Sequence, residues 1–302
     1  GSEMCIRDRF DYVLKFKKIS KNEISYRPLV RFRFFDLVLM QSVFNVVCDS
    51  LKNFLPSENY GVQLSEENSQ YLYKNWLSQY KKFTNQQKEN LSENTVFQYS
   101  YEYDIAQFFP SVQQQHLINQ LKDCLKINEE SLTYFWIEKI IKHFCEDNIS
   151  DETKPLFKEY FKNMKDILGD EVAKNYRNDL GLPQGPLYSA FLASFYTKDL
   201  LKKIRKGVKD NWDIDCEIFS YVDDGRIYFK DYISEHDKEV EKDTKEHSNR
   251  DSNINVEKYK GIKTIVCEAL KSINNEKINQ YRTCCFNGGR WSGICQRSGK
   301  TK

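Results

Sequence analysis

The chain has 302 residues, of which 40% are hydrophobic and 30% charged, so it is long enough for one large domain or two smaller ones with a substantial core. Its formal net charge is only +2, so binding to nucleic acid cannot be argued from bulk charge and would need local basic clusters. We expect no membrane partner, because the apolar run at residues 34–40 is broken by a charge, and the start of the chain has no secretory pattern, so we expect a cytoplasmic protein.

The first 95 residues predict helices. Apolar positions recur at helical spacing between residues 31 and 51 and again between residues 66 and 83, and a polar, loop-like stretch follows at 84–94. Ahead of the first helix, residues 1–30 are mixed and basic. Three arginines, Arg27, Arg31 and Arg33, lie around its start.

The next segment predicts a strand over residues 96–105 that carries Asp104 and runs into the aromatic pair Phe108-Phe109. Residues 111–161 have helical apolar spacing, and residues 145–180 are rich in charge. A kinked loop follows at residues 181–186, Gly-Leu-Pro-Gln-Gly-Pro, which we call the Leu-Pro-Gln-Gly loop. Its proline falls in the first turn of another predicted helix, where a missing N–H costs nothing.

Residues 217–229 read as two short strands joined by a tight turn, for which we expect Asp224-Gly225 to supply the turn chemistry. The adjacent carboxylates of Asp223 and Asp224 would repel each other at the tip of this hairpin unless a cation lay there. By itself the pattern also fits an ordinary solvated turn.

The remaining chain predicts a solvated insertion or charged helix at residues 231–256, then an amphipathic helix over 262–273, and a short Asn-Asn-Glu-Lys motif that ends at Lys277. The 25 residues after Lys277 are basic and short of apolar periodicity from Asn287 onward, and we expect no helical bundle there. The nine cysteines and four histidines have no zinc-ligand spacing, which predicts free thiols.

Three of these segments occur in a telling order: Asp104 with its two aromatics, the Leu-Pro-Gln-Gly loop, and the Tyr221-Val222-Asp223-Asp224 hairpin. In this order they resemble the reverse transcriptases, which are palm-type polymerases that build DNA. The resemblance implies an α+β fold of the right-hand polymerase type, with fingers over residues 1–95 and a palm over 96–302. It also implies a ferredoxin-like palm sheet, with the thumb absent or truncated.

The resemblance implies nucleotidyl transfer with two divalent ions about 3.5–4 Å apart. Asp104 and Asp223 would bridge both ions, the Ile105 carbonyl would add an oxygen ligand, and Asp224 would complete the negative field. Oxygen ligands suit Mg²⁺, with Mn²⁺ as a substitute.

The resemblance also implies which residues contact the incoming dNTP. Phe109 would lie under the sugar and exclude a 2′ hydroxyl, while Gln184, Gly185 and Tyr221 would contact the nucleotide. Lys277 would lie near the triphosphate, and Arg27, Arg31 or Arg33 would clamp it, without a choice among the three. Core packing for Phe109, a simple kink for the loop and a solvated face for the cations remain open.

A finer resemblance points to the abortive-infection and other defence-associated reverse transcriptases of bacteria. It rests on Pro110-Ser111-Val112 with His116, and on Tyr60-Gly61 followed by the aromatic and basic block at residues 76–83. A retron or group II intron enzyme is the alternative, as is a non-catalytic scaffold that binds nucleic acid or a partner protein. Expected partners are template and primer, a dedicated non-coding RNA, and a homo-oligomer or second subunit in place of the thumb.

Overall fold

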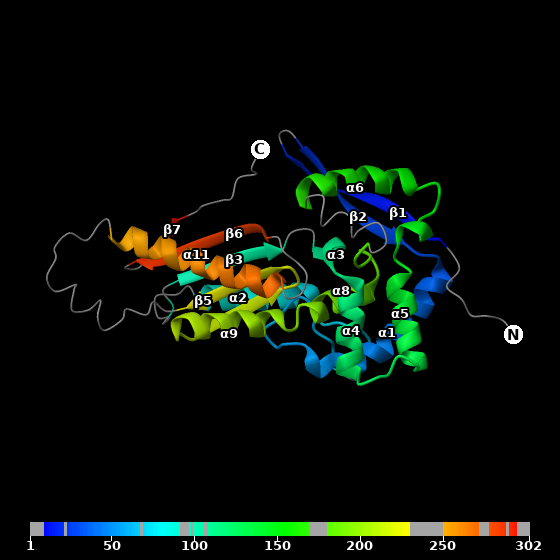
Figure 1. The fold of residues 1–302 in the computed structure, drawn as a ribbon, viewed down its shortest axis with the longest axis horizontal. Helices are drawn as coiled ribbons and strands as arrows, with labels where there is room; N and C mark the ends of the chain where they lie inside the picture. The colour runs from blue at the N-terminus through cyan, green and yellow to red at the C-terminus, as the bar shows by residue number, and fades with distance from the viewer. Residues whose placement is uncertain are drawn as a thin grey trace. The chain divides into compact units, whose positions relative to one another are not determined.

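The computed structural model divides the chain into two compact units that interleave along the sequence (Figure 1). The first unit is Gly1–Leu55 with Gln107–Tyr196, and the second is Pro56–Ala106 with Thr197–Lys302. A boundary between fingers and palm near residue 95 therefore stays a prediction. The structure describes residues 9–20, 23–66, 69–90, 97, 99–105, 108–168, 180–229, 250–271, 278–287 and 290–294.

The first unit consists of one β-hairpin and a set of helices. The hairpin strands pair in antiparallel register, from Asp11 opposite Arg31 to Ser20 opposite Glu23. These two strands were not predicted, because helices were expected over the first 95 residues. The elements are β1 (Asp11–Ser20), β2 (Glu23–Arg31), α1 (Phe34–Leu51), η1 (Lys52–Phe54), α3 (Phe108–Ser111), α4 (Gln114–Leu125), α5 (Leu132–Lys142), η2 (Glu146–Asn148), α6 (Lys154–Leu168) and α8 (Leu187–Tyr196).

The core of the first unit forms where α1 meets α8. Both helices were predicted from apolar spacing, and the structure confirms them. The Phe44 ring stacks on the Tyr188 ring with centroids 4.9 Å apart, and the Tyr188 hydroxyl donates to the Met40 sulfur at 3.5 Å. All three side chains are buried, so burial of apolar surface against α8 holds α1 in place, although α1 is only weakly amphipathic.

One described segment, Phe34–Phe54, is long and apolar enough to cross a membrane by length and composition alone. The expectation that a charge breaks this run was too simple, because Asp36 lies in the first turn of α1 and is itself buried. Core helices of soluble proteins meet the same criterion. Large apolar side chains on α1 that remain exposed are Phe34, Phe35, Val38 and Val46.

The second unit carries a five-stranded antiparallel sheet in the order β4-β5-β3-β6-β7 (Figure 1). Along the chain, helices separate β3 from β4 and β5 from β6, so the first four strands connect as β-α-β-β-α-β. The α+β class is confirmed. The elements are α2 (Trp76–Asn90), β3 (Tyr99–Ile105), α9 (Leu200–Trp212), β4 (Cys216–Tyr221), β5 (Asp224–Phe229), α11 (Arg250–Lys271), β6 (Ile278–Asn287) and β7 (Arg290–Ile294).

Helices α9 and α11 pack against each other, and α9 also contacts β4. Gly207 on α9 allows the close approach, since a Cβ at that position would lie 2.6 Å from the Ile265 side chain. On α11, Ile262, Val266 and Leu270 are buried, which confirms the amphipathic helix predicted there.

The C-terminal strands β6 and β7 were not predicted. Instead of a segment without regular structure, residues 278–287 pair with β3 and residues 290–294 pair with β6. Residues 230–249, which hold most of the predicted insertion at 231–256, lie outside the described residues, and so does Lys277.

Candidate active site

The predicted hairpin is present, but its turn differs from the prediction. Tyr221 pairs with Asp224, so the two loop residues are Val222 and Asp223, and the Asp-Gly pair belongs to β5. Val222 has a φ of +58°, a conformation that such a turn usually assigns to glycine and that a β-branched residue rarely adopts. The backbone at Val222 is therefore strained, and Asp223 follows directly on it.

Gly225 was predicted to form part of the turn, but in the structure it lies within β5 and packs against β3. It lies opposite Tyr103 on β3, and a Cβ at Gly225 would lie 2.0 Å from Cζ of the Tyr103 ring. The ring therefore covers the glycine, and only a residue without a side chain fits. Burial first, and then the charge of Asp224, raise the pKa of the Tyr103 hydroxyl. This packing helps to fix the register of β5 against β3.

The same register brings the three predicted acids to one end of the sheet. Asp104 on β3 lies directly opposite Asp224 on β5, and the Ile105 N–H donates to the Asp223 carbonyl at 3.1 Å. Directly opposed residues on antiparallel strands have Cα atoms about 4.5–5.5 Å apart and side chains on the same face. Asp104, Asp223 and Asp224 are thus neighbours, although more than a hundred residues separate the first from the others.

The electrostatics of this cluster disfavour full ionisation. Desolvation within the hairpin, followed by repulsion from Asp223, raises the pKa of Asp224 to about 6. Glu102 adds to the rise, while Arg226 opposes it. Arg226 is held between the Glu102 carboxylate, 3.3 Å from its Nε, and the Phe83 ring, 4.7 Å from its guanidinium carbon. A cation at the carboxylates would relieve the remaining repulsion.

The residues present fit a hard cation by their chemistry. Three carboxylates and a backbone carbonyl are the oxygen donors that Mg²⁺ and Mn²⁺ take. In the described part of the chain, however, no three His, Cys, Asp or Glu side chains are grouped so that they could hold one metal ion. The predicted ligands are therefore brought near one another by the backbone without forming a ready cage, and their roles as metal ligands stay predictions.

The segment at residues 58–61, far upstream in the sequence, contacts the hairpin and its turn. The Tyr60 N–H donates to the Ser220 carbonyl at 2.8 Å, and the Ser220 N–H donates to the Glu58 carbonyl at 3.0 Å. A Cβ on Gly61 would lie 2.4 Å from the Val222 nitrogen. The backbone at Gly61 therefore abuts the strained residue. The sequence marked Tyr60-Gly61 only as a subgroup motif, and its contact with the hairpin could not be inferred from that.

Aromatic side chains hold Tyr221. Its ring meets the Tyr80 ring edge-on at 5.4 Å and the Phe83 ring at 5.8 Å, both on α2. Burial, and then the neighbouring Tyr80, raise the pKa of the Tyr221 hydroxyl. Tyr221 is thus positioned by α2 as well as by its own strand.

In the first unit, two predicted nucleotide residues lie on the Leu-Pro-Gln-Gly loop, which is tied to β2. The Val30 N–H donates to the Gln184 carbonyl at 2.8 Å. Gly185 has a φ of +129°, and a Cβ there would lie 3.1 Å from the Val30 carbonyl oxygen. Glycine is needed here both for its conformation and for the close approach to β2.

Phe109 is tied to the start of the same loop. Its carbonyl accepts from the Leu182 N–H at 2.9 Å, and a Cβ on Gly181, which has a φ of +76°, would lie 2.3 Å from that carbonyl oxygen. The Phe109 side chain is half-buried, whereas Phe108 is buried in the core. The structure therefore brings Phe109, Gln184 and Gly185 onto one connected piece of backbone.

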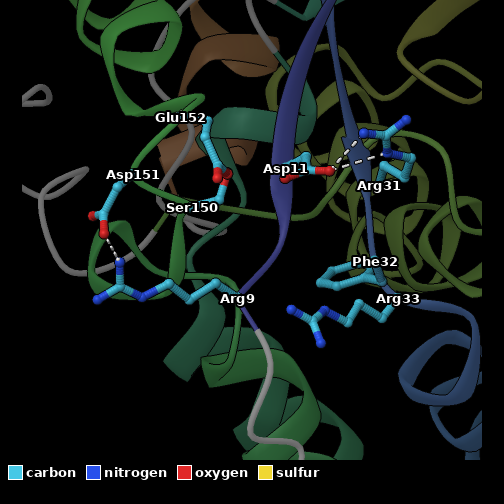
Figure 2. A pocket seen from close by; sticks show the side chains of 8 residues that line it. All are labelled: Arg9, Asp11, Arg31, Phe32, Arg33, Ser150, Asp151 and Glu152. Atoms are coloured by element: carbon cyan, nitrogen blue, oxygen red, sulfur yellow. Dashed lines mark hydrogen bonds and ion pairs between the residues drawn. The ribbon is translucent and has the colours of Figure 1, made fainter.

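The predicted arginines differ in their surroundings. Arg31 and Arg33 line an open cavity of about 610 Å³ together with Arg9, and Figure 2 shows how Arg31 and Arg9 are each joined to a carboxylate. Arg31 donates to Asp11 through Nη2 at 2.7 Å and Nε at 3.1 Å, which holds the pKa of that carboxyl below its usual value. Arg27 lies on β2, opposite Lys15, with an exposed side chain.

A match to a family model identifies the family of this chain. No curated protein matches the chain. Among solved structures, an apo telomerase from Candida tropicalis truncated from its C-terminal domain has 12% sequence identity and a TM-score of 0.46, with 95% of this chain and 54% of that chain covered. This chain therefore spans about half the length of that telomerase chain. The family model "Reverse transcriptase (RNA-dependent DNA polymerase)" matches residues 19–281, well over half of the sequence. The chain belongs to the reverse transcriptase family.

Proposed function

We propose that the protein is an RNA-directed DNA polymerase that adds dNTPs to a nucleic acid 3′ end, with Asp104, Asp223 and Asp224 as its catalytic acids. The observation that carries this proposal is the register of β3 against the hairpin, which sets Asp104 opposite Asp224 and bonds Ile105 to Asp223. Membership of the reverse transcriptase family supplies the reaction class.

Each acid has a distinct task in this proposal. Asp104 and Asp223, with the Ile105 carbonyl, hold two Mg²⁺ or Mn²⁺ ions, which when bound activate the primer hydroxyl and offset the charge of the triphosphate. Asp224 contributes charge to the same region. The bond between the Ile105 N–H and the Asp223 carbonyl keeps the two backbones in register while the carboxylates bind and release cations.

Nucleotide selection is assigned to Phe109, Gln184, Gly185 and Tyr221. Phe109 excludes a 2′ hydroxyl, and Gln184 offers its amide to the sugar and the base-pair edge. The hydrogen bonds from Leu182 to Phe109 and from Val30 to Gln184 support the assignment of Phe109, Gln184 and Gly185, because they join these three residues through the backbone of the first unit.

We assign the phosphates to Arg27, Arg31 or Arg33, without a choice among the three, and to Lys277. Two N–H groups of Arg31 already donate to Asp11, which leaves fewer of them for a phosphate. Arg33 borders the cavity in Figure 2, which opens between the start of β1, the end of β2 and the turn at residues 150–152.

The test is incorporation of labelled dNTPs by the purified chain on an RNA template with a DNA primer. We expect incorporation that requires the template, stops on addition of a chelator and returns with Mg²⁺ or Mn²⁺. A chain that binds primer–template but incorporates nothing under any divalent ion would favour the non-catalytic scaffold instead.

A role in bacterial antiphage defence is the finer proposal, supported by the segments at residues 60–83 and 110–116. It predicts that a bacterial host that expresses the wild-type protein resists phage and that a host that expresses the Asp223→Asn variant does not. Sequencing nucleic acid that copurifies with the protein would show whether it carries a dedicated RNA and which DNA it makes.

A further inference from the structure

Helix α2 presents large apolar side chains to solvent beside the catalytic hairpin. Trp76 is 66% exposed, Tyr80 is 46% exposed and Leu77 is 44% exposed. Tyr80 is also in ring contact with Tyr221, two residues before Asp223. The exposed aromatics are therefore continuous with the edge of the proposed active site, and both belong to the second unit.

The helix is anchored through buried side chains on a stripe that runs beside Trp76 and Tyr80. Phe83 is buried between the rings of Tyr60 and Tyr221, at 6.0 and 5.8 Å. Near the end of the helix, the buried Asn90 side chain donates to Glu217 at 3.1 Å. Burial and hydrogen bonding thus hold α2 in place through this stripe, while Trp76, Leu77 and Tyr80 keep a large surface in contact with solvent.

The charge around the exposed side of α2 is positive. Between residues 74 and 90 the chain has four lysines and one glutamate, and Lys74, Lys81, Lys82 and Lys88 are all exposed. Trp76 and Tyr80 lie one turn apart on the helix, and Leu77 and Lys81 form the neighbouring row, so the two rings lie beside an ammonium group on this side of α2. Exposed aromatics interleaved with lysines suit single-stranded nucleic acid, whose bases stack on rings and whose phosphates attract cations.

We propose that this exposed side of α2, formed by Trp76, Leu77, Tyr80, Lys81 and Lys88, binds a single-stranded segment of nucleic acid and leads it to the catalytic hairpin. The inference rests on the proposed function for the identity of the strand, which is the one being copied or extended. Its own evidence is the continuity of the rings with Tyr221 and the positive charge around them.

The direct test is the affinity of the full-length protein for a fluorescent 20-nucleotide DNA strand, measured by anisotropy in a chelator and without dNTPs. Replacing both Trp76 and Tyr80 by Ala should weaken binding by about ten- to a hundredfold, the usual loss when a stacking ring is removed. The double Phe variant at the same positions should keep most of the affinity. The matched control replaces Phe35 and Phe135, exposed aromatics of the first unit, by Ala and should bind normally.

An abasic strand of the same length separates stacking from charge. It should bind the wild-type protein more weakly than the normal strand, and the double Ala variant should discriminate little between the two. The Lys81→Gln, Lys88→Gln variant should reduce the slope of log affinity against log salt by about 0.7 for each lost phosphate contact.

Two results would overturn the inference. One is unchanged affinity of the double Ala variant for DNA, with the wild type active in dNTP incorporation. The other is unchanged DNA affinity with loss of self-association in sedimentation, which would make the face a contact between protein chains. Failure of the proposed function is distinguishable, because it would appear as absent incorporation while binding still depends on Trp76 and Tyr80.

Discussion

At the scale of single residues, Asp224 lies where its ionised form is disfavoured by desolvation and by Asp223, so its pKa is about 6 rather than 3.8. Between these two values the folded chain binds more protons at this position than the unfolded chain does. The contribution of Asp224 to the free energy of unfolding must therefore fall as the pH rises from about 4 to about 6.

Replacing Asp224 by Asn should remove that contribution. We expect urea unfolding across pH 4 to 7 to give a shallower loss of stability in the variant than in the wild type. Addition of Mg²⁺ at pH 7 should stabilise the wild type more than the variant, because the cation relieves a repulsion that Asn no longer makes. Parallel curves for the two proteins would show that Asp224 is not under electrostatic strain.

Phe109 offers a second test at this scale. Its backbone is fixed by the Leu182 N–H, while its side chain is half-buried. Phe109→Ala should admit ribonucleotides by opening space beneath the sugar, measured as the ratio of dNTP to rNTP incorporation. Phe108→Ala is the control, because it should reduce stability through a core cavity without changing that ratio. An unchanged ratio in Phe109→Ala would assign the residue to the core.

At the scale of elements, the hairpin depends on a segment that no local signal connects to it. Gly61 and Gly207 both lie where a Cβ would overlap a neighbour, the Val222 backbone in one case and the Ile265 side chain in the other. Each Gly→Ala change should cost about 1–3 kcal/mol of stability through overpacking. Only Gly61→Ala should also reduce dNTP incorporation, because it displaces the turn that carries Asp223.

Thermal unfolding and incorporation rates of the two variants measure this difference. Equal loss of activity in both variants would mean that activity follows stability alone. In that case the Tyr60-Gly61 segment would be an ordinary packing element rather than a support for the turn.

The helices and strands also show which parts of this fold could be predicted from patterns in the sequence. Helix α1, helix α11 and the β4–β5 hairpin were predictable, because each has an apolar periodicity or an acidic turn of its own. The turn residues were not, because the position of Gly225 is set by the Tyr103 ring on another strand. Strands β1 and β2 were missed because they form a basic, partly exposed hairpin. Strands β6 and β7 were missed because β6 pairs with β3, which is distant in the sequence.

The acidic residues of the candidate site could be predicted from the sequence, but the residues that hold them in place could not. Asp104 and Asp223 could be placed together from motif order, and the register explains that placement through backbone pairing. The roles of Gly61, Tyr103 and α2 depend on long-range packing, which single-sequence patterns do not encode.

At the scale of the whole molecule, the residues proposed for catalysis belong to the second unit and those proposed for nucleotide selection mostly to the first. The net charge is only +2, so we expect a weak hold on a duplex, because each phosphate contact adds a salt-dependent term to the affinity. We expect short products that shorten further as salt rises, measured at single-hit enzyme levels. Long products from a monomer in moderate salt would reveal a stronger clamp than the charge implies.

The central claim is that Asp104 and Asp223 carry the reaction, and the most direct measurement compares dNTP incorporation by the wild type, Asp104→Asn, Asp223→Asn and the double variant. Asp215→Asn, a highly exposed acid in the same unit, is the matched control. The account predicts background incorporation in all three site variants, with undiminished stability because a repulsive charge is removed, and normal incorporation in the control. Primer extension by the double variant would contradict the account and place the active site elsewhere.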